Sequence, residues 1–512
     1  MSKLNEVASC KSNSEKPTPS SLSLLSTPLH PASCKAPAAA STLGSPAAAV
    51  KLSHDRRRSP PTHRSDVHRS SPVLLHIQPV VRVHAPLGVA RTLGARRIAG
   101  TPPPPTCSKS VLTVMRFAVT KVCGGRGKAR AGALHIGGGG IGIETPALLL
   151  STRKGLPSFV SCDLLASLPF PDSLLLHVCP THFIEGPPLK TISNIGGLHR
   201  MLGLPDHILV AAAGDSIESL PSSEATNKFG ASFDTPSGRR LIKPSDYMEL
   251  VSCMKPNLWA SLADEVPAWV TEKRNKISVD RTLRWLDACI ALDAASGTNS
   301  LGVIVGGSSV EQQRLCATEV SKRNVSGFWI GGFGLGENIE ERCSLLNAVT
   351  DCLPPEKPRL VSRLGLPEEV LEGVAAGIDL FDSTYIYQLT MGGFALIFPV
   401  DMVEREVQNG IFNNDGGDST KINLRATTYR KDTSRLVDSC SCFTCQNHTR
   451  AYLNHLLNVH EMLAQILLEI HNTHHYLHFF RSIREAIKVG EFDLFRQQFV
   501  KKRRANIAAA MV

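Results

Sequence analysis

The second half of the chain alternates short apolar runs with amphipathic stretches at a regular spacing. The apolar runs have the length of buried strands, and the stretches that follow repeat apolar residues at helical spacing. Three such pairs follow one another: LGVIVGG with SVEQQRLCATEVSKRN, GFWIGGFGLGE with NIEERCSLLNAVTDCL, and PRLVSRLG with PEEVLEGVAAG. Because parallel strands need a long crossover, usually a helix, the pattern predicts an α/β fold, either a TIM-type (β/α)8 barrel or a doubly wound sheet.

The bulk composition is compatible with such a fold and sets limits on other classes. Hydrophobic residues make up 42% and charged residues 20% of the 512 positions, which is ordinary for a globular protein. No run of about 18 apolar residues occurs, so we expect no transmembrane helix.

Residues 1–114 differ from the rest of the chain in composition and charge. They are rich in Ser, Pro, Ala and Arg, and such a segment cannot bury enough apolar area to offset the entropy lost on ordering. We therefore predict a disordered extension, and its Arg-rich, acid-poor character also fits two alternatives: an organelle transit peptide, or an over-long start ahead of Met115. This segment contains fifteen Lys and Arg residues and four acids, which accounts for the whole net charge of +11. The rest of the chain is therefore neutral.

The cysteines indicate a reducing compartment. Fourteen are scattered without the spacing of a disulfide framework, and the N-terminus lacks the apolar region of a secretory signal. We expect an intracellular, cytoplasmic protein, with association with mitochondria as the alternative.

One group of cysteines is clustered in DSCSCFTCQNHTRAYLNHL. Cys440, Cys442 and Cys445 have the one- and two-residue spacing with which thiolates surround a tetrahedral metal ion. The fourth ligand is open at this level, because several histidines follow. The nearest is His448, whereas His471 and His474 share the buried stripe of the next helix-like run.

The segment CSCFTCQNHTRAYLNHL, followed by EIHNTHHYLHFFRSIREAI, resembles the zinc subdomain of a known family, the tRNA-guanine transglycosylases. The resemblance continues through IETPALLLSTRKG, LPDHILVAAAGDS and GIDLFDS. The resemblance implies a TIM-type barrel over residues 115–435 with an attached zinc-binding subdomain over residues 436–512. It also implies one structural Zn²⁺ per chain, with ligands Cys440, Cys442, Cys445 and, from the family's His-Asn pair, His471.

The resemblance also shows what the chain has lost. The family exchanges a tRNA guanine through a covalent link between an aspartate and the ribose, and a second acid moves protons. The nucleophile position falls on Asp382 in GIDLFD, but Ala211 in ILVAAAG replaces the second aspartate. Gln388 and Met391 stand where the family has arginines, whereas Asp264 keeps a base-reading carboxylate. The comparison therefore implies a vestigial nucleophile and no catalytic residues.

A chain that retains the zinc motif but lacks the second acid resembles the non-catalytic branch of the family. That branch pairs with a catalytic queuine tRNA-ribosyltransferase paralogue, so we expect a heterodimer in which this chain binds tRNA while its partner exchanges guanine for queuine at the wobble position. Two alternatives remain: a self-sufficient exchange enzyme with an acid such as Asp215, or a zinc-stabilised RNA-binding scaffold. The candidate tRNA contacts are Arg481, Arg484, Lys501, Lys502, Arg503 and Arg504.

Overall fold

The structure is a computed structural model of the chain. It describes residues 115–510 except 125–126, 138–141, 216, 218–223, 236–237, 294–298 and 401–419. The predicted disorder of residues 1–114 therefore lies outside the described residues. The described part belongs to one compact unit, Thr101–Val512.

Eight parallel strands close into a barrel, in which neighbours in sequence are neighbours in space and the last strand pairs with the first. All eight are short and buried, as expected for a parallel sheet covered by helices. The TIM-type barrel predicted from the sequence is thus confirmed. Its strands are β4 (Ala147–Ser151), β5 (Leu175–Val178), β6 (Ile208–Ala211), β9 (Leu258–Ala260), β10 (Asn299–Ile304), β11 (Gly327–Ile330), β12 (Arg359–Val361) and β13 (Leu380–Asp382).

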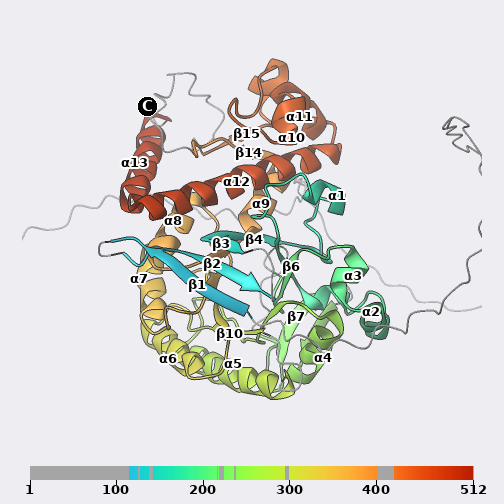
Figure 1. The fold of residues 1–512 in the computed structure, drawn as a ribbon, viewed down its shortest axis with the longest axis vertical. Coiled ribbons are helices and arrows are strands. Elements are labelled where there is room, and N and C mark those ends of the chain that lie inside the picture. Colours follow the sequence, from blue (N-terminus) through green and yellow to red (C-terminus); the bar gives the residue numbers. More distant parts are fainter. Residues whose placement is uncertain are drawn as a thin grey trace, which may run out of the picture. The chain divides into compact units, whose positions relative to one another are not determined.

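Helices follow the strands and cover the outside of the barrel (Figure 1). Local signals start several of them: Ser309 caps α6 by accepting a hydrogen bond from the Gln312 N–H, and Pro367 occupies the first turn of α8. The helices are α1 (Cys162–Leu165), α2 (Leu189–Ile195), α3 (Leu198–Leu202), α4 (Pro244–Met254), α5 (Glu272–Asp293), α6 (Val310–Ser321), α7 (Ile339–Thr350), α8 (Pro367–Ala375) and α9 (Thr384–Gly392), with a short 3-10 turn η1 (Pro180–Phe183) after β5.

A small antiparallel sheet, which the sequence analysis did not predict, lies at the amino-terminal end of the barrel. It consists of β1 (Met115–Val122), β2 (Arg130–Ile136) and β3 (Ile143–Thr145). Met115 and Leu134 from this sheet border a small cavity together with residues of six barrel strands, and the Met115 N–H donates to Asn299 Oδ1 at 2.9 Å. The sheet therefore covers that end of the barrel and leaves the opposite end for function.

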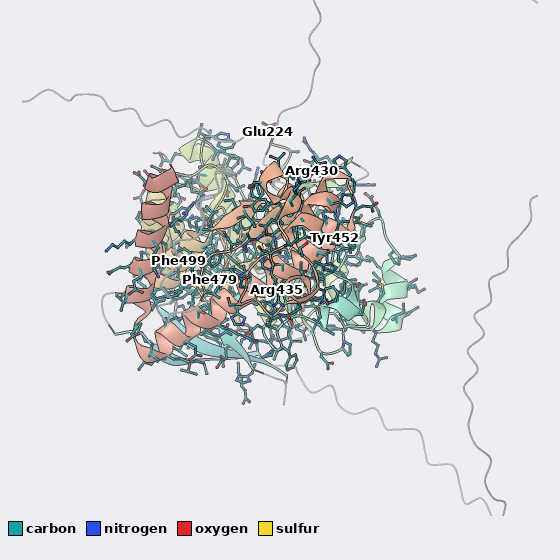
Figure 2. All side chains as sticks on the ribbon, turned by 90° about the horizontal axis from the view of Figure 1, so that it is seen from above. Glu224, Arg430, Arg435, Tyr452, Phe479 and Phe499 are labelled. Atoms are coloured by element: carbon teal, nitrogen blue, oxygen red, sulfur yellow. The ribbon has the colours of Figure 1, made fainter. Side chains whose placement is uncertain are left out.

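The C-terminal region is organised around one long helix, α12 (Leu463–Val489), which lies between the barrel and the metal-binding region (Figure 1). Phe479 of α12 packs against Phe499 of α13 (Phe492–Ala510), with ring centroids 5.6 Å apart (Figure 2). The remaining elements are a hairpin after β6, with β7 (Ala231–Thr235) and β8 (Gly238–Ile242), and β14 (Phe394–Leu396), β15 (Lys421–Asn423), η2 (Thr427–Lys431), α10 (Phe443–Asn447) and α11 (Arg450–Asn458).

A second, smaller hydrophobic core supports the metal-binding region. It joins the three clustered cysteines to apolar residues of β15, α11 and the first turns of α12, and it includes Ala395 of β14. This core therefore draws on strands that precede residue 436 in the sequence. No helix among the described residues has the length and apolar character needed to cross a bilayer.

Candidate metal centre and barrel mouth

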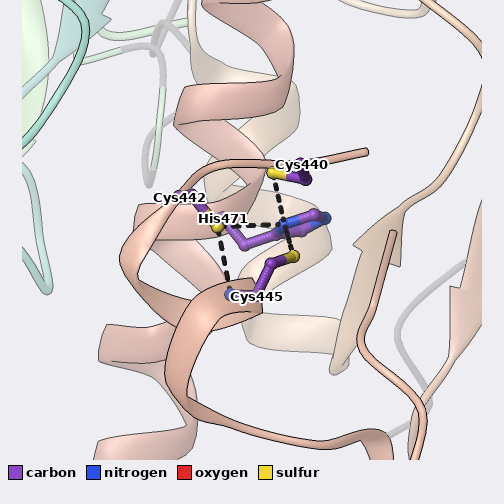
Figure 3. A group of neighbouring side chains, drawn as sticks. All are labelled: Cys440, Cys442, Cys445 and His471. Atoms are coloured by element: carbon purple, nitrogen blue, oxygen red, sulfur yellow. Dashed lines mark hydrogen bonds between the residues drawn. The ribbon is translucent and has the colours of Figure 1, made fainter. Parts of the chain in front are cut away.

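Four side chains from two segments converge between α10 and α12 (Figure 3). Cys440 precedes α10, Cys442 is its N-cap and accepts a hydrogen bond from the Cys445 N–H at 3.3 Å, and His471 projects from the third turn of α12. All four are buried, with exposed fractions of 8% or less. The structure thus brings together the ligand set that the sequence and the family resemblance predict.

The distances fit a single tetrahedral ion. His471 Nδ1 lies 3.9 Å from Cys440 Sγ, 3.5 Å from Cys442 Sγ and 3.3 Å from Cys445 Sγ. Sulfur and nitrogen ligands around one zinc ion stand about 3.6 Å apart when the bonds are about 2.3 and 2.05 Å long. The group can therefore hold one metal ion.

Backbone groups of β14 fix the orientation of the histidine. His471 Nε2 lies 2.8 Å from the Leu396 carbonyl oxygen, which can only accept, so Nε2 carries the proton and Nδ1 is free to bind a metal. The adjacent Asn472 accepts from the Leu396 N–H at 2.9 Å and donates to the Phe394 oxygen at 3.0 Å. The His-Asn pair therefore locks α12 to β14 and aims the ring at the sulfurs.

The competing histidines lie elsewhere. His474 Nδ1 is 3.7 Å from Cys440 Sγ, but this histidine is not part of the group whose ligand atoms all lie within 4.8 Å of one another. His448 stacks on Tyr452, with ring centroids 5.2 Å apart. Neither histidine occupies the fourth ligand position.

A second candidate site is a hollow of about 580 Å³, including space open to solvent, at the carboxyl ends of the barrel strands. Barrel enzymes carry their chemistry at this end. Most of its wall is small or aromatic, and the polar groups are two serines, one glutamate and one arginine. The lining is Ala212, Ala213, Gly214, Phe233, Ala260, Ser261, Ala263, Glu265, Val303, Trp329, Ser362 and Arg363.

Asp382, at the nucleophile position, does not line this hollow. It is 1% exposed, and its two oxygens accept hydrogen bonds from the backbone N–H groups of Arg363 at 2.9 Å and Thr384 at 3.2 Å. Burial raises the pKa of its carboxyl group above the ordinary value, despite these two donors. The side chain is held as an internal acceptor.

The other surviving carboxylate, Asp264, is also engaged inside the protein. It pairs with Arg274, with one contact of 2.7 Å and another of 2.8 Å, and with Arg281 at 3.0 Å. Its side chain has no exposed surface. Neither carboxylate inherited from the family motifs is therefore presented to a ligand.

The position of the missing acid lies at the end of β6. Ala211 is fully buried, and the next two alanines, Ala212 and Ala213, form part of the wall of the hollow. Asp215, the alternative acid considered from the sequence, lies 2.9 Å from His182 Nε2 and accepts from the Ile217 N–H at 2.8 Å. Its carboxylate is thus fixed by a histidine and by its own turn.

Of the six predicted tRNA contacts, one needs correction. Arg484 is 3% exposed and binds Asp172 at 2.7 Å and the Pro146 carbonyl oxygen at 3.0 Å, so it stabilises the interior rather than meeting phosphate. It was predicted as a contact because it is a basic residue of the C-terminal region, but Asp172 from the loop before β5 covers it. Arg481 also binds Asp172.

Lys501 and Lys502 are exposed, whereas Arg503 pairs with Glu368 of α8. The side chain of Arg504 lies outside the described residues. Phosphate contact by these C-terminal residues stays a prediction.

An ion pair in the hollow was not predicted from the sequence. Arg363 Nη1 donates to Glu265 Oε2 at 2.9 Å, and their side chains are 9% and 15% exposed. The only sequence signal was position, because both residues closely follow barrel strands, where functional groups gather.

Comparison with known proteins then decides the family. A family model described as queuine tRNA-ribosyltransferase matches residues 123–505. The chain belongs to this family. Relatives named queuine tRNA-ribosyltransferase accessory subunit 2 include one from Xenopus tropicalis, 34% identical over 420 residues, which are 76% of this chain and 100% of the relative. A human relative is 36% identical over 57% of this chain and 77% of its own length, and one from Trichoplax adhaerens is 33% identical over 70% and 92%.

Membership of the queuine tRNA-ribosyltransferase family agrees with the barrel and with the Cys3His group. The match spans both the barrel and α12, so it includes the hollow and the metal ligands alike. At the two acid positions that the resemblance implies, the chain has the buried Ala211 and Asp382, which accepts backbone N–H groups.

Proposed function

We propose that this chain is a non-catalytic subunit of queuine tRNA-ribosyltransferase. It binds tRNA and the catalytic subunit in a heterodimer, and the partner exchanges guanine for queuine at the anticodon wobble position. The names of the relatives support an accessory role. The observation that carries the proposal is the state of the two acid positions: Ala211 offers no proton, and both oxygens of Asp382 accept backbone N–H groups.

The proposed metal is zinc, with a structural role. Three thiolates and one imidazole are a ligand set typical of structural zinc, and four protein ligands leave no open position for a reactive water. The set joins the segment before α10 to α12 and, through the hydrogen bond of His471, to β14. Zinc would therefore hold together three segments that also meet in the small hydrophobic core.

The surface of the metal-binding region supports a protein partner. Phe443, Tyr452, Val459, Met462 and Leu463 expose large apolar side chains on α10, α11 and the start of α12. A group of exposed aromatic and aliphatic residues is typical of an interaction surface. A paralogue with a similar region would meet it in a pseudo-twofold arrangement, as in a homodimer.

The proposed contact with tRNA depends on exposed cations rather than on base recognition. Lys501 and Lys502 are free of the acidic side chain that binds their neighbour Arg503. Such residues neutralise phosphates without reading sequence, so their contribution falls with salt.

The test is co-expression with the catalytic paralogue. Size-exclusion chromatography with light scattering should give one species at the summed mass, and incorporation of labelled guanine into tRNA should need both chains. The chain alone should incorporate nothing above background. Exchange by the isolated chain would favour the self-sufficient enzyme, with Asp215 as the first candidate acid. A paralogue that is fully active alone and does not bind this chain would favour the RNA-binding scaffold.

A further inference from the structure

Arg363 has a backbone conformation that side chains rarely adopt. Its φ is +65°, in the left-handed region that favours glycine. Three other non-glycine residues among those described share a positive φ, namely Lys154, Lys255 and His460, and all three are exposed. Arg363 is different because its side chain is 9% exposed and lies in the wall of the hollow. An unfavourable conformation that is kept inside a site indicates a function.

Two neighbours are fitted to this conformation. The buried Asp382 accepts the Arg363 N–H at 2.9 Å, which fixes the peptide group. Gly334 gives room, because a Cβ at this position would lie 2.9 Å from the Arg363 Cβ. The residue at the former nucleophile position therefore positions the arginine.

The side chain reaches across the mouth of the barrel. Arg363 follows β12 and its partner Glu265 follows β9, and β10 and β11 stand between those strands in the barrel. The Glu265 carboxylate lies close to the end of β11, since a Cβ on Gly331 would be 3.3 Å from its carboxyl carbon. The ion pair thus spans the hollow and satisfies both charges internally.

We infer that Arg363 is a built-in plug, which together with Glu265 fills the space that a base would need. The rest of the lining would suit a planar, hydrogen-bonding heterocycle, because it offers the rings of Trp329 and Phe233 and the hydroxyl groups of two serines. This inference rests on the proposed non-catalytic role and adds a cause to it: the chain's own ion pair narrows the hollow, independently of the missing acid.

The test is the binding of labelled guanine to the isolated chain by equilibrium dialysis. Arg363→Gly removes the plug and suits the positive φ, and Arg363→Ala removes the plug without relieving the backbone. Both variants should bind guanine at least about tenfold more tightly than the wild-type chain. Arg323→Ala is the matched control, because it removes an arginine paired with Asp287 and Glu319 ahead of β11, at the other end of the barrel. It should bind like the wild type.

Three outcomes would overturn the inference. Guanine could bind the wild type as tightly as the variants, it could bind less tightly once Arg363 is removed, or it could bind none of the folded proteins. Circular dichroism checks folding, and the alanine variant serves if the glycine variant fails to fold. Because the dialysis contains neither tRNA nor the paralogue, its result is separate from complex formation, on which the proposed function depends.

Discussion

Replacing Asp382 tests whether its carboxylate acts as a structural hydrogen-bond acceptor or as a catalytic nucleophile. The carboxylate is buried and accepts two backbone N–H groups, from Arg363 and Thr384. A buried donor left without an acceptor costs about 1–3 kcal/mol, so Asp382→Ala should destabilise the fold by roughly 2–6 kcal/mol. Asp382→Asn keeps one carbonyl oxygen and should cost roughly 1–3 kcal/mol, since one of the two N–H donors loses its acceptor.

The destabilisation should depend on pH in a defined direction. Burial raises the pKa of Asp382 in the folded state, so the folded protein binds this proton more tightly than the unfolded chain does. The stabilising contribution of the carboxyl group is then fully present below the unfolded pKa of about 3.9 and is lost as the pH rises through the folded pKa. The difference between the wild type and Asp382→Asn should therefore be largest near pH 4 and smaller at pH 7.

Two measurements check this reasoning. Denaturant unfolding at several pH values gives the free-energy differences, and base exchange by the purified heterodimer gives activity per folded complex. The Asp382→Asn complex should exchange guanine within about twofold of the wild-type rate, whereas loss of a covalent nucleophile costs several orders of magnitude. Unchanged stability together with abolished exchange would refute the structural role and restore Asp382 as a nucleophile.

Three further predictions concern the metal and the basic residues. His471→Ala should lower the zinc content from about one ion per chain and reduce the folded yield, as measured by elemental analysis and circular dichroism; full zinc retention would contradict the assigned ligand set. Arg484→Met should destabilise the protein by about 3–5 kcal/mol, because it leaves Asp172 partly unpaired. The folded variant should bind tRNA with unchanged affinity; weaker tRNA binding would return Arg484 to the RNA contacts. Replacing Lys501 and Lys502 together by Gln should leave stability unchanged and reduce both tRNA affinity and its salt slope, by about two units at most, in filter binding; an unaltered slope would place the contact elsewhere.

Local sequence determined the features that depend on short spacing. The strand and helix alternation indicated a parallel sheet because each crossover leaves its own apolar periodicity, and the resemblance then chose the barrel over the doubly wound alternative. The spacing of Cys440, Cys442 and Cys445 indicated a metal site because three thiolates so close in sequence can reach one ion. The loss of the acid at Ala211 was visible in a motif of a few residues.

Tertiary structure decided what depends on atoms far apart in sequence. His471 and His474 lie on the same stripe of α12, and the Leu396 oxygen, 75 positions away, aims His471 at the sulfurs. Arg484 was predicted as a phosphate contact from its charge alone, but it pairs inside the protein with Asp172, 312 positions away. The pair of Arg363 with Glu265, 98 positions apart, exists only because the barrel brings the ends of β9 and β12 to one mouth. Sequence periodicity indicates which face of an element is buried. The partner of a charged side chain depends instead on which distant segments the fold brings together.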